Sequence, residues 1–143
     1  MRGWARFIGV TGHEDPEVLR RALDLYEFDT VLLPVNPAEA QHRSFLPLAA
    51  DAFSRGLGVI GMKVLCRGLT LQLAENPPEL VPELVAYALS QPVSLVVIGA
   101  DNPVQVQGLA AAARNFVPMT EEEQRAVEDA VAPYARRLLY YKP

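Results

Sequence analysis

Four short apolar segments, each followed by a small polar turn and then by a helical pattern, constrain the fold of this chain more than any other feature. The first is Phe7-Ile8-Gly9-Val10-Thr11-Gly12-His13, where an apolar strand ends in a polar turn and a helix begins near Asp15. The same order recurs at residues 30–37, 58–63 and 94–102. Strands that are apolar on both faces and alternate with helices predict a parallel sheet with right-handed crossovers.

The spacing of apolar residues, prolines and glycines sets the elements that we expect. Strands are predicted at residues 6–11, 30–33, 58–62 and 94–98. Helices are predicted at 16–26, 45–55 and 103–114, from the break Asn76-Pro77-Pro78 to about Leu89, from Thr120 to about Leu139, and briefly at 69–74. Asp15 and Ser44 are suited to cap helices, Thr120 and Glu123 form a capping box, and Gly56 ends a helix.

These elements predict one fold class. It is α/β: half of a (β/α)8 TIM barrel, with four parallel strands, flanking helices and a C-terminal helix, in a single domain over residues 1–143. A chain of 143 residues fits one domain and buries about 70% of its unfolded surface, so it needs no disulfide or metal for stability.

Composition argues against several classes of function. The formal net charge of -4 leaves no basic stripe for nucleic acid or anionic lipid, so we expect neither as a partner. The one cysteine, Cys66, excludes a disulfide framework and indicates a reducing compartment, so we expect a cytoplasmic protein. We find no signal-peptide pattern and no apolar run of about 20 residues, and therefore expect a chain that is neither secreted nor membrane-spanning.

Polar residues gather where the predicted strands end. The carboxyl ends of parallel strands meet at one edge of the sheet, and ligands bind there in α/β folds. The residues placed at these ends are Thr11, His13, Asn36, Lys63, Asp101 and Asn102. We therefore expect these side chains to converge on one rim.

Lys63 carries the sharpest chemical expectation. A lysine at the end of an apolar strand has a lowered pKa, and such a lysine can serve as the Schiff-base nucleophile of a barrel aldolase. The commoner interpretation is a structural lysine that faces solvent or pairs with Asp101. Borohydride reduction in the presence of a carbonyl compound distinguishes the two, because only the nucleophile forms an adduct.

The other polar candidates have a functional and a structural interpretation each. His13 could act as a general acid or base or contact a cofactor amide, since an unperturbed pKa of about 6.5 suits proton transfer, or it could cap the next helix. Asp101 and Asn102 stand before Pro103, which favours a helix cap over catalysis. Cys66 is expected to be a small core or rim residue. His13 and His42 match no metal spacing, so no metal site is predicted.

Several segments at these strand ends resemble the aldo-keto reductase family, and the resemblance covers nearly the whole chain. Arg6-Phe7-Ile8-Gly9-Val10-Thr11-Gly12-His13 resembles the fifth strand and turn of that family. Phe28-Asp29-Thr30-Val31 and Pro34-Val35-Asn36-Pro37 resemble the sixth strand, and Tyr87-Ala88-Leu89-Ser90-Gln91-Pro92-Val93-Ser94 resembles the segment leading into the eighth. The chain is therefore similar to the second half of that barrel only.

The resemblance implies an NADP cofactor. In that family, strands one to four supply the tyrosine, lysine, aspartate and histidine that deliver a proton during hydride transfer, and the half that is similar here contributes cofactor contacts. The implied cofactor-binding residues are Thr11, Asn36, Met62, Asp101 and Asn102. The chain departs from the pattern where Met62 replaces an aromatic ring and where residues 99–106 lack the basic groups that meet the adenosine 2'-phosphate. Asp101 would repel that phosphate, although N–H groups at the following helix start could bind an anion.

A half barrel leaves a physical problem, because its two edge strands lack partners and its inner face exposes apolar side chains. A two-fold homodimer could join two half barrels. Alternatively, the aromatic C-terminal segment Leu138-Leu139-Tyr140-Tyr141 could fold over the open face, or the chain could be a truncated reductase whose N-terminal half lies in a longer reading frame.

Two functions from different classes follow. The first is an aldo-keto-reductase-like oxidoreductase fragment that does not reduce carbonyls by itself, with Thr11, His13, Asn36, Lys63 and Asp101 on its rim. The second is a non-catalytic half barrel that persists as a homodimer or binds a small molecule or partner. Saturable binding of NADPH favours the first.

Overall fold

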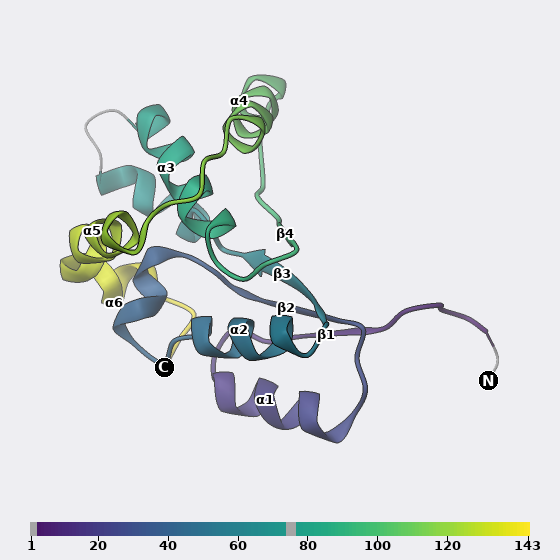
Figure 1. Ribbon diagram of the computed structural model, residues 1–143. Coiled ribbons are helices and arrows are strands. Elements are labelled where there is room, and N and C mark those ends of the chain that lie inside the picture. The colour runs from purple at the N-terminus through teal and green to yellow at the C-terminus, as the bar shows by residue number, and fades with distance from the viewer. Residues whose placement is uncertain (1–2, 74–76) are drawn as a thin grey trace.

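A parallel sheet of four strands forms the centre of the computed structural model, which describes residues 3–73 and 77–143. The strands are β1 (Gly9–Thr11), β2 (Thr30–Pro34), β3 (Gly58–Met62) and β4 (Leu95–Val96). They lie side by side in the order β1-β2-β3-β4, and each pairs with the next one along the chain (Figure 1). This order confirms the predicted half of a (β/α)8 barrel.

The two edge strands are shorter than the sequence predicts. β1 begins at Gly9 instead of Arg6, and β4 ends at Val96 instead of Ile98. Each has a neighbour on one side only, so fewer of its backbone groups are held in regular ladders. Pairing still extends beyond β4, because the Val97 N–H donates to the Gly61 carbonyl at 2.8 Å.

Helices follow the strands as expected. The α-helices are α1 (Pro16–Leu25), α2 (Leu46–Ser54), α3 (Pro77–Leu89), α4 (Pro103–Arg114), α5 (Glu121–Val131) and α6 (Ala135–Leu138), and the short 3-10 turns are η1 (Pro37–Gln41), η2 (Cys66–Gly68), η3 (Thr70–Leu73) and η4 (Ala132–Tyr134). The Asp15 carboxylate caps α1 through the Glu17 N–H, and Gly56, with a φ of 82°, ends α2. Asn76, in the predicted break before α3, lies outside the described residues. No helix within 3–73 and 77–143 is long and apolar enough to cross a membrane, and a cytoplasmic location stays a prediction.

The single helix predicted from Thr120 to Leu139 is wrong in its second half. The capping box is present, since the Thr120 hydroxyl accepts from the Glu123 N–H and the Glu123 carboxylate accepts from the Thr120 N–H. However, the helix divides into α5, η4 and α6, because Pro133 has no N–H to donate. The change of direction brings Leu138 and Tyr141 into a second apolar cluster beside η1 and η2.

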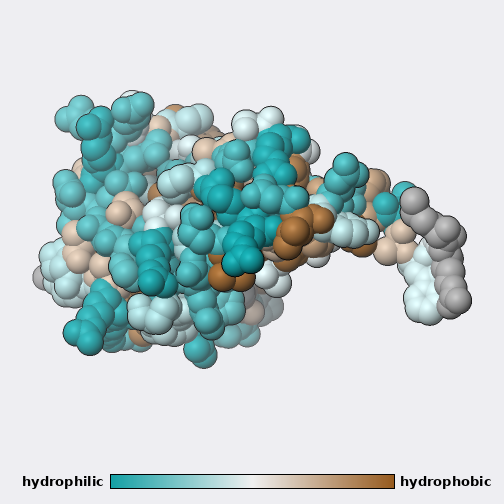
Figure 2. Space-filling view, turned by 90° about the horizontal axis from the view of Figure 1, so that it is seen from below, coloured by the Kyte–Doolittle hydropathy of each residue, from teal (hydrophilic) through white to brown (hydrophobic). Residues whose placement is uncertain are grey.

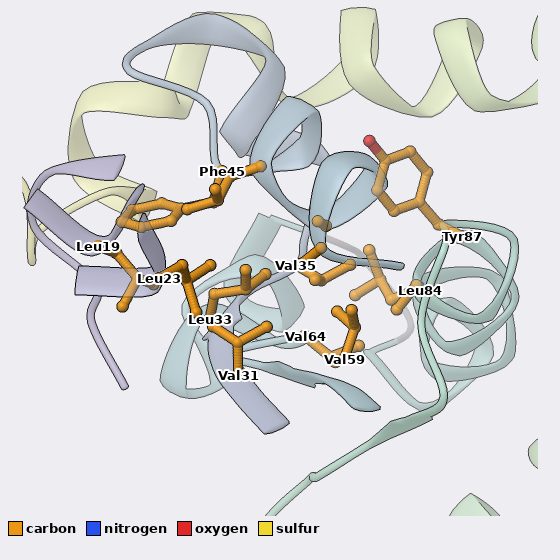
Figure 3. Packing of buried hydrophobic residues seen from close by; sticks show 14 of the residues in the cluster. Leu19, Leu23, Val31, Leu33, Val35, Phe45, Val59, Val64, Leu84 and Tyr87 are labelled. Carbon is orange, nitrogen blue, oxygen red and sulfur yellow. The ribbon is translucent and has the colours of Figure 1, made fainter. Parts of the chain in front are cut away.

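Helices cover one face of the sheet, and the main core lies between these helices and the strands. The register places Val31 of β2 opposite Val59 of β3, and both are fully buried. Figure 3 shows the strand residues Val31, Leu33 and Val59 between Leu19, Leu23 and Phe45 on one side and Leu84 and Tyr87 on the other. Successive side chains of a strand point to opposite faces, so every second residue of β2 and β3 contributes to this core.

The alternate residues form a row on the opposite face. Strand register aligns Thr11, Leu32, Ile60 and Leu95, one from each strand. Leu32 and Ile60 are half-buried, and Thr11 and Leu95 are exposed. Leu32, Ile60 and Leu95 pack in neither apolar cluster of the described residues. The C-terminal segment does not fold over this face, as one sequence-based alternative had it, because it packs beside η1 and η2.

A substitution at Gly61 tests how closely the helix-covered face of the sheet is packed. A Cβ added there would lie 3.2 Å from side-chain atoms of both Val35 and Val96, which are β-branched and unable to move aside easily. We expect Gly61→Ala to lower the free energy of unfolding by about 1–3 kcal/mol in urea denaturation. Gly99→Ala is the matched control, because nothing lies within 4 Å of its added Cβ. Equal stability of the two variants would contradict this packing.

Candidate functional site

The end of the chain returns to the carboxyl ends of β1, β2 and β3, where the Tyr141 side chain lies among three of the predicted site residues. The His13 ring meets the Tyr141 ring edge-on, with 6.1 Å between centroids. Lys63 Nζ lies 4.7 Å from the centre of the same ring, a cation–π contact. Asn36 Nδ2 donates to the Tyr141 hydroxyl at 3.0 Å. The structure thus gathers His13, Asn36 and Lys63, but around a tyrosine that the strand-end pattern did not include.

A buried carboxylate holds this tail in place. Glu39 is fully buried in η1, which the Asn36 side chain caps through the Ala38 N–H at 3.1 Å. Glu39 Oε1 accepts from the Tyr141 hydroxyl at 2.7 Å. Glu39 Oε2 accepts from Lys142 Nζ at 2.6 Å and from the Phe45 N–H at 2.9 Å. We call Asn36, Glu39, Tyr141 and Lys142 the Glu39 cluster.

The hydrogen bonds of the Glu39 cluster balance its charges. Besides Glu39, the Lys142 ammonium donates to the carbonyls of His42 at 2.8 Å and Arg43 at 2.7 Å, so all three of its protons have acceptors. Burial lowers the pKa of Lys142, and the bond to Glu39 opposes that change. Burial raises the pKa of Tyr141, and the charge of Glu39 adds to the effect. The phenol therefore stays protonated and directed at Glu39.

A separate cavity of about 920 Å³ opens at the carboxyl ends of β3 and β4. Lys63 and Arg67 line it from the segment after β3, and Asp101 lines it from the turn after β4. Its remaining wall is largely apolar and is formed by Val81 of α3, Val97 of the segment after β4, and Val104 and Leu109 of α4. The cavity therefore combines two cations with an apolar wall.

Lys63 is the residue that the rim and the cavity share. Its backbone φ of 58° lies in the left-handed region, which turns the chain sharply after β3. Burial lowers the pKa of Lys63, and the positive charge of Arg67 lowers it further. Pairing with Asp101 was one of two alternatives for a structural lysine, and no ion pair within the described residues joins Lys63 to Asp101. The expected lowering of the Lys63 pKa has the same direction as in the structure.

The other predicted site residues fall into distinct settings. Asn102 caps α4, because its Oδ1 accepts from the Gln105 N–H at 3.0 Å, and the Asp101 N–H donates to Gln105 Oε1 at 2.6 Å. The interpretation of Asn102 as a helix cap is confirmed. Thr11 is exposed and Met62 half-buried, and their cofactor contacts stay predictions. A cofactor could reach the buried amide of Asn36 only if Tyr141 moved.

Sequence reasoning missed Glu39, Lys142 and Arg67. Glu39 and Lys142 are 103 positions apart, and nothing local indicates their pairing. Arg67 stands four positions after the strand-end Lys63, and this second cation near the same edge was the available signal. Cys66, expected as a small core or rim residue, is buried, and burial raises the pKa of its thiol to about 11. In 3–73 and 77–143, no group of three histidine, cysteine or acidic side chains could hold a metal ion.

Glu39→Gln tests the buried ion pair. The substitution leaves the Lys142 ammonium buried beside a neutral amide, and we expect the free energy of unfolding to fall by about 3–5 kcal/mol. Urea denaturation followed by circular dichroism measures the loss. Adding Lys142→Met removes the unpaired positive charge and should restore part of the lost free energy of unfolding.

A surface pair provides the control for this prediction. Glu121 and Arg125 are 3.3 Å apart and well exposed, so Glu121→Gln should cost no more than about 1 kcal/mol. If Glu39→Gln is no more destabilising than Glu121→Gln, the Glu39 cluster does not anchor the tail.

Because the side chains of Tyr87 and Tyr141 are buried, we expect the protein to lose stability at alkaline pH. The Tyr141 hydroxyl donates to Glu39, and the Tyr87 hydroxyl donates to Glu128 Oε1 at 2.6 Å. The pKa of each is raised in the folded state, chiefly by burial, so their contribution is full below about pH 10 and falls as the pH rises further. The free energy of unfolding of Tyr87→Phe and of Tyr141→Phe should therefore fall less between about pH 9 and 11 than that of the wild type. Tyr134→Phe, at an exposed position, should follow the wild type.

Comparison with known proteins identifies the architecture. No protein-family model matches the chain, and no curated protein matches it in sequence. Similar solved structures include aldo-keto reductase AKR11C1 from Bacillus halodurans in its holo form, 18% identical with a TM-score of 0.66, and in its apo form, 19% identical with a TM-score of 0.67. Each match covers 87% of this chain and 50% of that one. The chain thus spans half the length of these structures and has the fold of half an aldo-keto reductase barrel.

Proposed function

We propose that this chain is the cofactor-side half of an aldo-keto-reductase-type barrel, which binds the phosphate groups of NADP in the cavity beside β3 and β4 and does not reduce carbonyls by itself. The observation that carries the proposal is the presence of Lys63 and Arg67 on one wall of that cavity. The similar Bacillus halodurans enzyme has a holo and an apo form, which agrees with a fold that takes up a cofactor.

The two cations suit a phosphate for complementary reasons. A guanidinium such as that of Arg67 can donate two parallel hydrogen bonds to phosphate oxygens, and an ammonium acts as a compact point charge. The lowered pKa of Lys63 reflects burial beside a like charge, and a bound anion would relieve both effects. The sequence alone argued against a phosphate because residues 99–106 contain no basic group, but the charge is supplied from the segment after β3.

The rest of the cavity suits a nucleotide. Its volume lies within the range of roughly 300–1,000 Å³ that is usual for small-molecule sites. Val97, Val104 and Leu109 offer an apolar surface for a base or a ribose. Asp101 is exposed, so water can solvate its charge, and it is outnumbered by the two cations.

The arrangement around Tyr141 explains why we assign no reductase activity to the chain. Tyr141, Lys63 and His13 form a grouping of residue types like the one that delivers the proton in aldo-keto reductases. Here the tyrosine hydroxyl donates to Glu39 and accepts from Asn36 in a buried position, so it has no proton to offer to a substrate. The catalytic half would have to come from another polypeptide segment.

Lys63 supports a second candidate function, because a lysine of lowered pKa at the edge of a cavity can form a Schiff base. Incubation with an aldehyde and cyanoborohydride, followed by peptide mass spectrometry, tests this activity. An aldolase requires an adduct at Lys63 that forms faster than at exposed lysines, and a lack of that preference excludes it.

Titration with NADPH tests the proposed function. We expect saturable binding by fluorescence or calorimetry, and weaker binding of NADH if the 2'-phosphate meets the cations. Arg67→Gln and Lys63→Met should each weaken NADPH binding about tenfold or more, because each removes a charge-assisted hydrogen bond worth about 1.5–3 kcal/mol. Arg21→Gln, on the exposed surface of α1, is the charge-matched control. Absence of saturation up to millimolar NADPH, or equal affinity of Arg67→Gln and Arg21→Gln, would refute the proposal.

A further inference from the structure

The uncovered face of the sheet is the largest feature that the proposed function leaves without a role. Parallel sheets are normally covered on both faces, because their strands are apolar on both. Here Val31 and Val59 on one face are fully buried. In the row on the other face, Thr11 and Leu95 are exposed, and Leu32 and Ile60 are half-buried. We call this row and the two strand edges beside it the open face.

The strand edges extend the open face at both ends. β1 and β4 each pair on one side only, so their outer edges present unpaired backbone groups. Apolar side chains flank these edges: Phe7 is 67% exposed before β1, and Val97 is 47% exposed after β4. An exposed apolar surface of this kind marks an interaction site. Figure 2, which views the molecule from below, also shows apolar side chains near the place where the N-terminal segment leaves the body.

We propose that a second copy of this chain occupies the open face and completes an eight-stranded parallel barrel. A rotation of 180° about an axis parallel to the strands adds four strands that run in the same direction. It sets β4 of each copy against β1 of the other, so both seams are parallel pairs and the interface is self-complementary. Eight parallel strands close into a barrel whose interior side chains can fill.

The residues of the open face fit a copy of themselves. Leu32, Ile60 and Leu95 from both copies would face one another across the interior, which gives the apolar interior that such barrels have. The row contains no charged side chain, so like charges do not oppose self-association. The solved structures with this fold support the geometry, because the chain accounts for half of each and the remaining half is what a second copy would replace.

The symmetry has a consequence for the cavity beside β4. Because β1 of the second copy would lie next to β4, Thr11 and His13 of that copy would approach the turn that carries Asp101. His13 would then belong to a site built from two chains. The two-chain site depends on formation of the dimer, and it does not depend on whether NADP is the ligand.

Light scattering coupled to size-exclusion chromatography tests the assembly. We expect a mass of twice 15.7 kDa, which falls toward a single chain on dilution. Leu95→Lys places a charge in the row at a position that is already 46% exposed, so the monomer should still fold and the dimer dissociation constant should rise at least tenfold. Leu25→Lys, on α1 outside the open face, is the control and should leave the dimer intact.

Crosslinking tests which edges meet. Cys66 is buried, so newly introduced thiols are the reactive ones toward a short bis-maleimide. The double variant Thr11→Cys/Val97→Cys should yield a covalent dimer, and Thr11→Cys alone should not, because the proposed seams join β1 to β4. A monomer at every concentration, a larger oligomer, a dimer insensitive to Leu95→Lys, or crosslinking by Thr11→Cys alone would each overturn the proposal. So would a monomer that binds an added reductase half barrel, strands one to four, in place of its own copy.

Discussion

The arrangement of the strand-end rim depends on one buried carboxylate. Glu39 lies in a turn after β2 where water cannot reach it, and an isolated charge there would cost several kcal/mol. Its partners come from the end of the chain, through the Tyr141 hydroxyl and the Lys142 ammonium. These hydrogen bonds hold the C-terminal tail against the rim, together with the apolar contacts of Val131, Leu138 and Leu139.

Because Tyr141 occupies the strand-end rim, the charged groups that a ligand could reach lie in another part of the molecule. Tyr141 lies at the ends of β1 to β3, so the amide of Asn36 is occupied within the protein, and the ring contacts both His13 and Lys63. What remains open is the cavity at β3 and β4, with its two cations. The same lysine serves both places: its ammonium stacks on the tyrosine ring and also lines the cavity. Lys63 therefore contacts the tail and borders the cavity at the same time.

The two faces of the sheet differ in how far their side chains are buried. The helical face is close-packed, with Val31, Leu33 and Val59 fully buried beneath α1, α2 and α3. The other face keeps Leu32, Ile60 and Leu95 in contact with water, which costs the hydrophobic stabilisation that a barrel interior would provide. The described packing thus comes from one layer of helices against the sheet and from the Glu39 cluster, and burial of the open face in the proposed dimer would add to it.

Local patterns in the sequence were enough to predict the four βα units, their parallel order, the caps at Asp15 and Asn102, and the resemblance to the second half of a reductase barrel. Each of these depends on residues within a few positions of one another. The folded chain was needed to show that Glu39 pairs with Lys142, that Arg67 joins Lys63 at one cavity, that the last helix breaks at Pro133, and that Asp101 does not pair with Lys63. These depend on contacts between segments far apart in the chain, or on a backbone turn such as that at Lys63. A pattern of neighbouring residues does not specify which distant charge will meet another, because burial and packing make that choice once the strands have assembled.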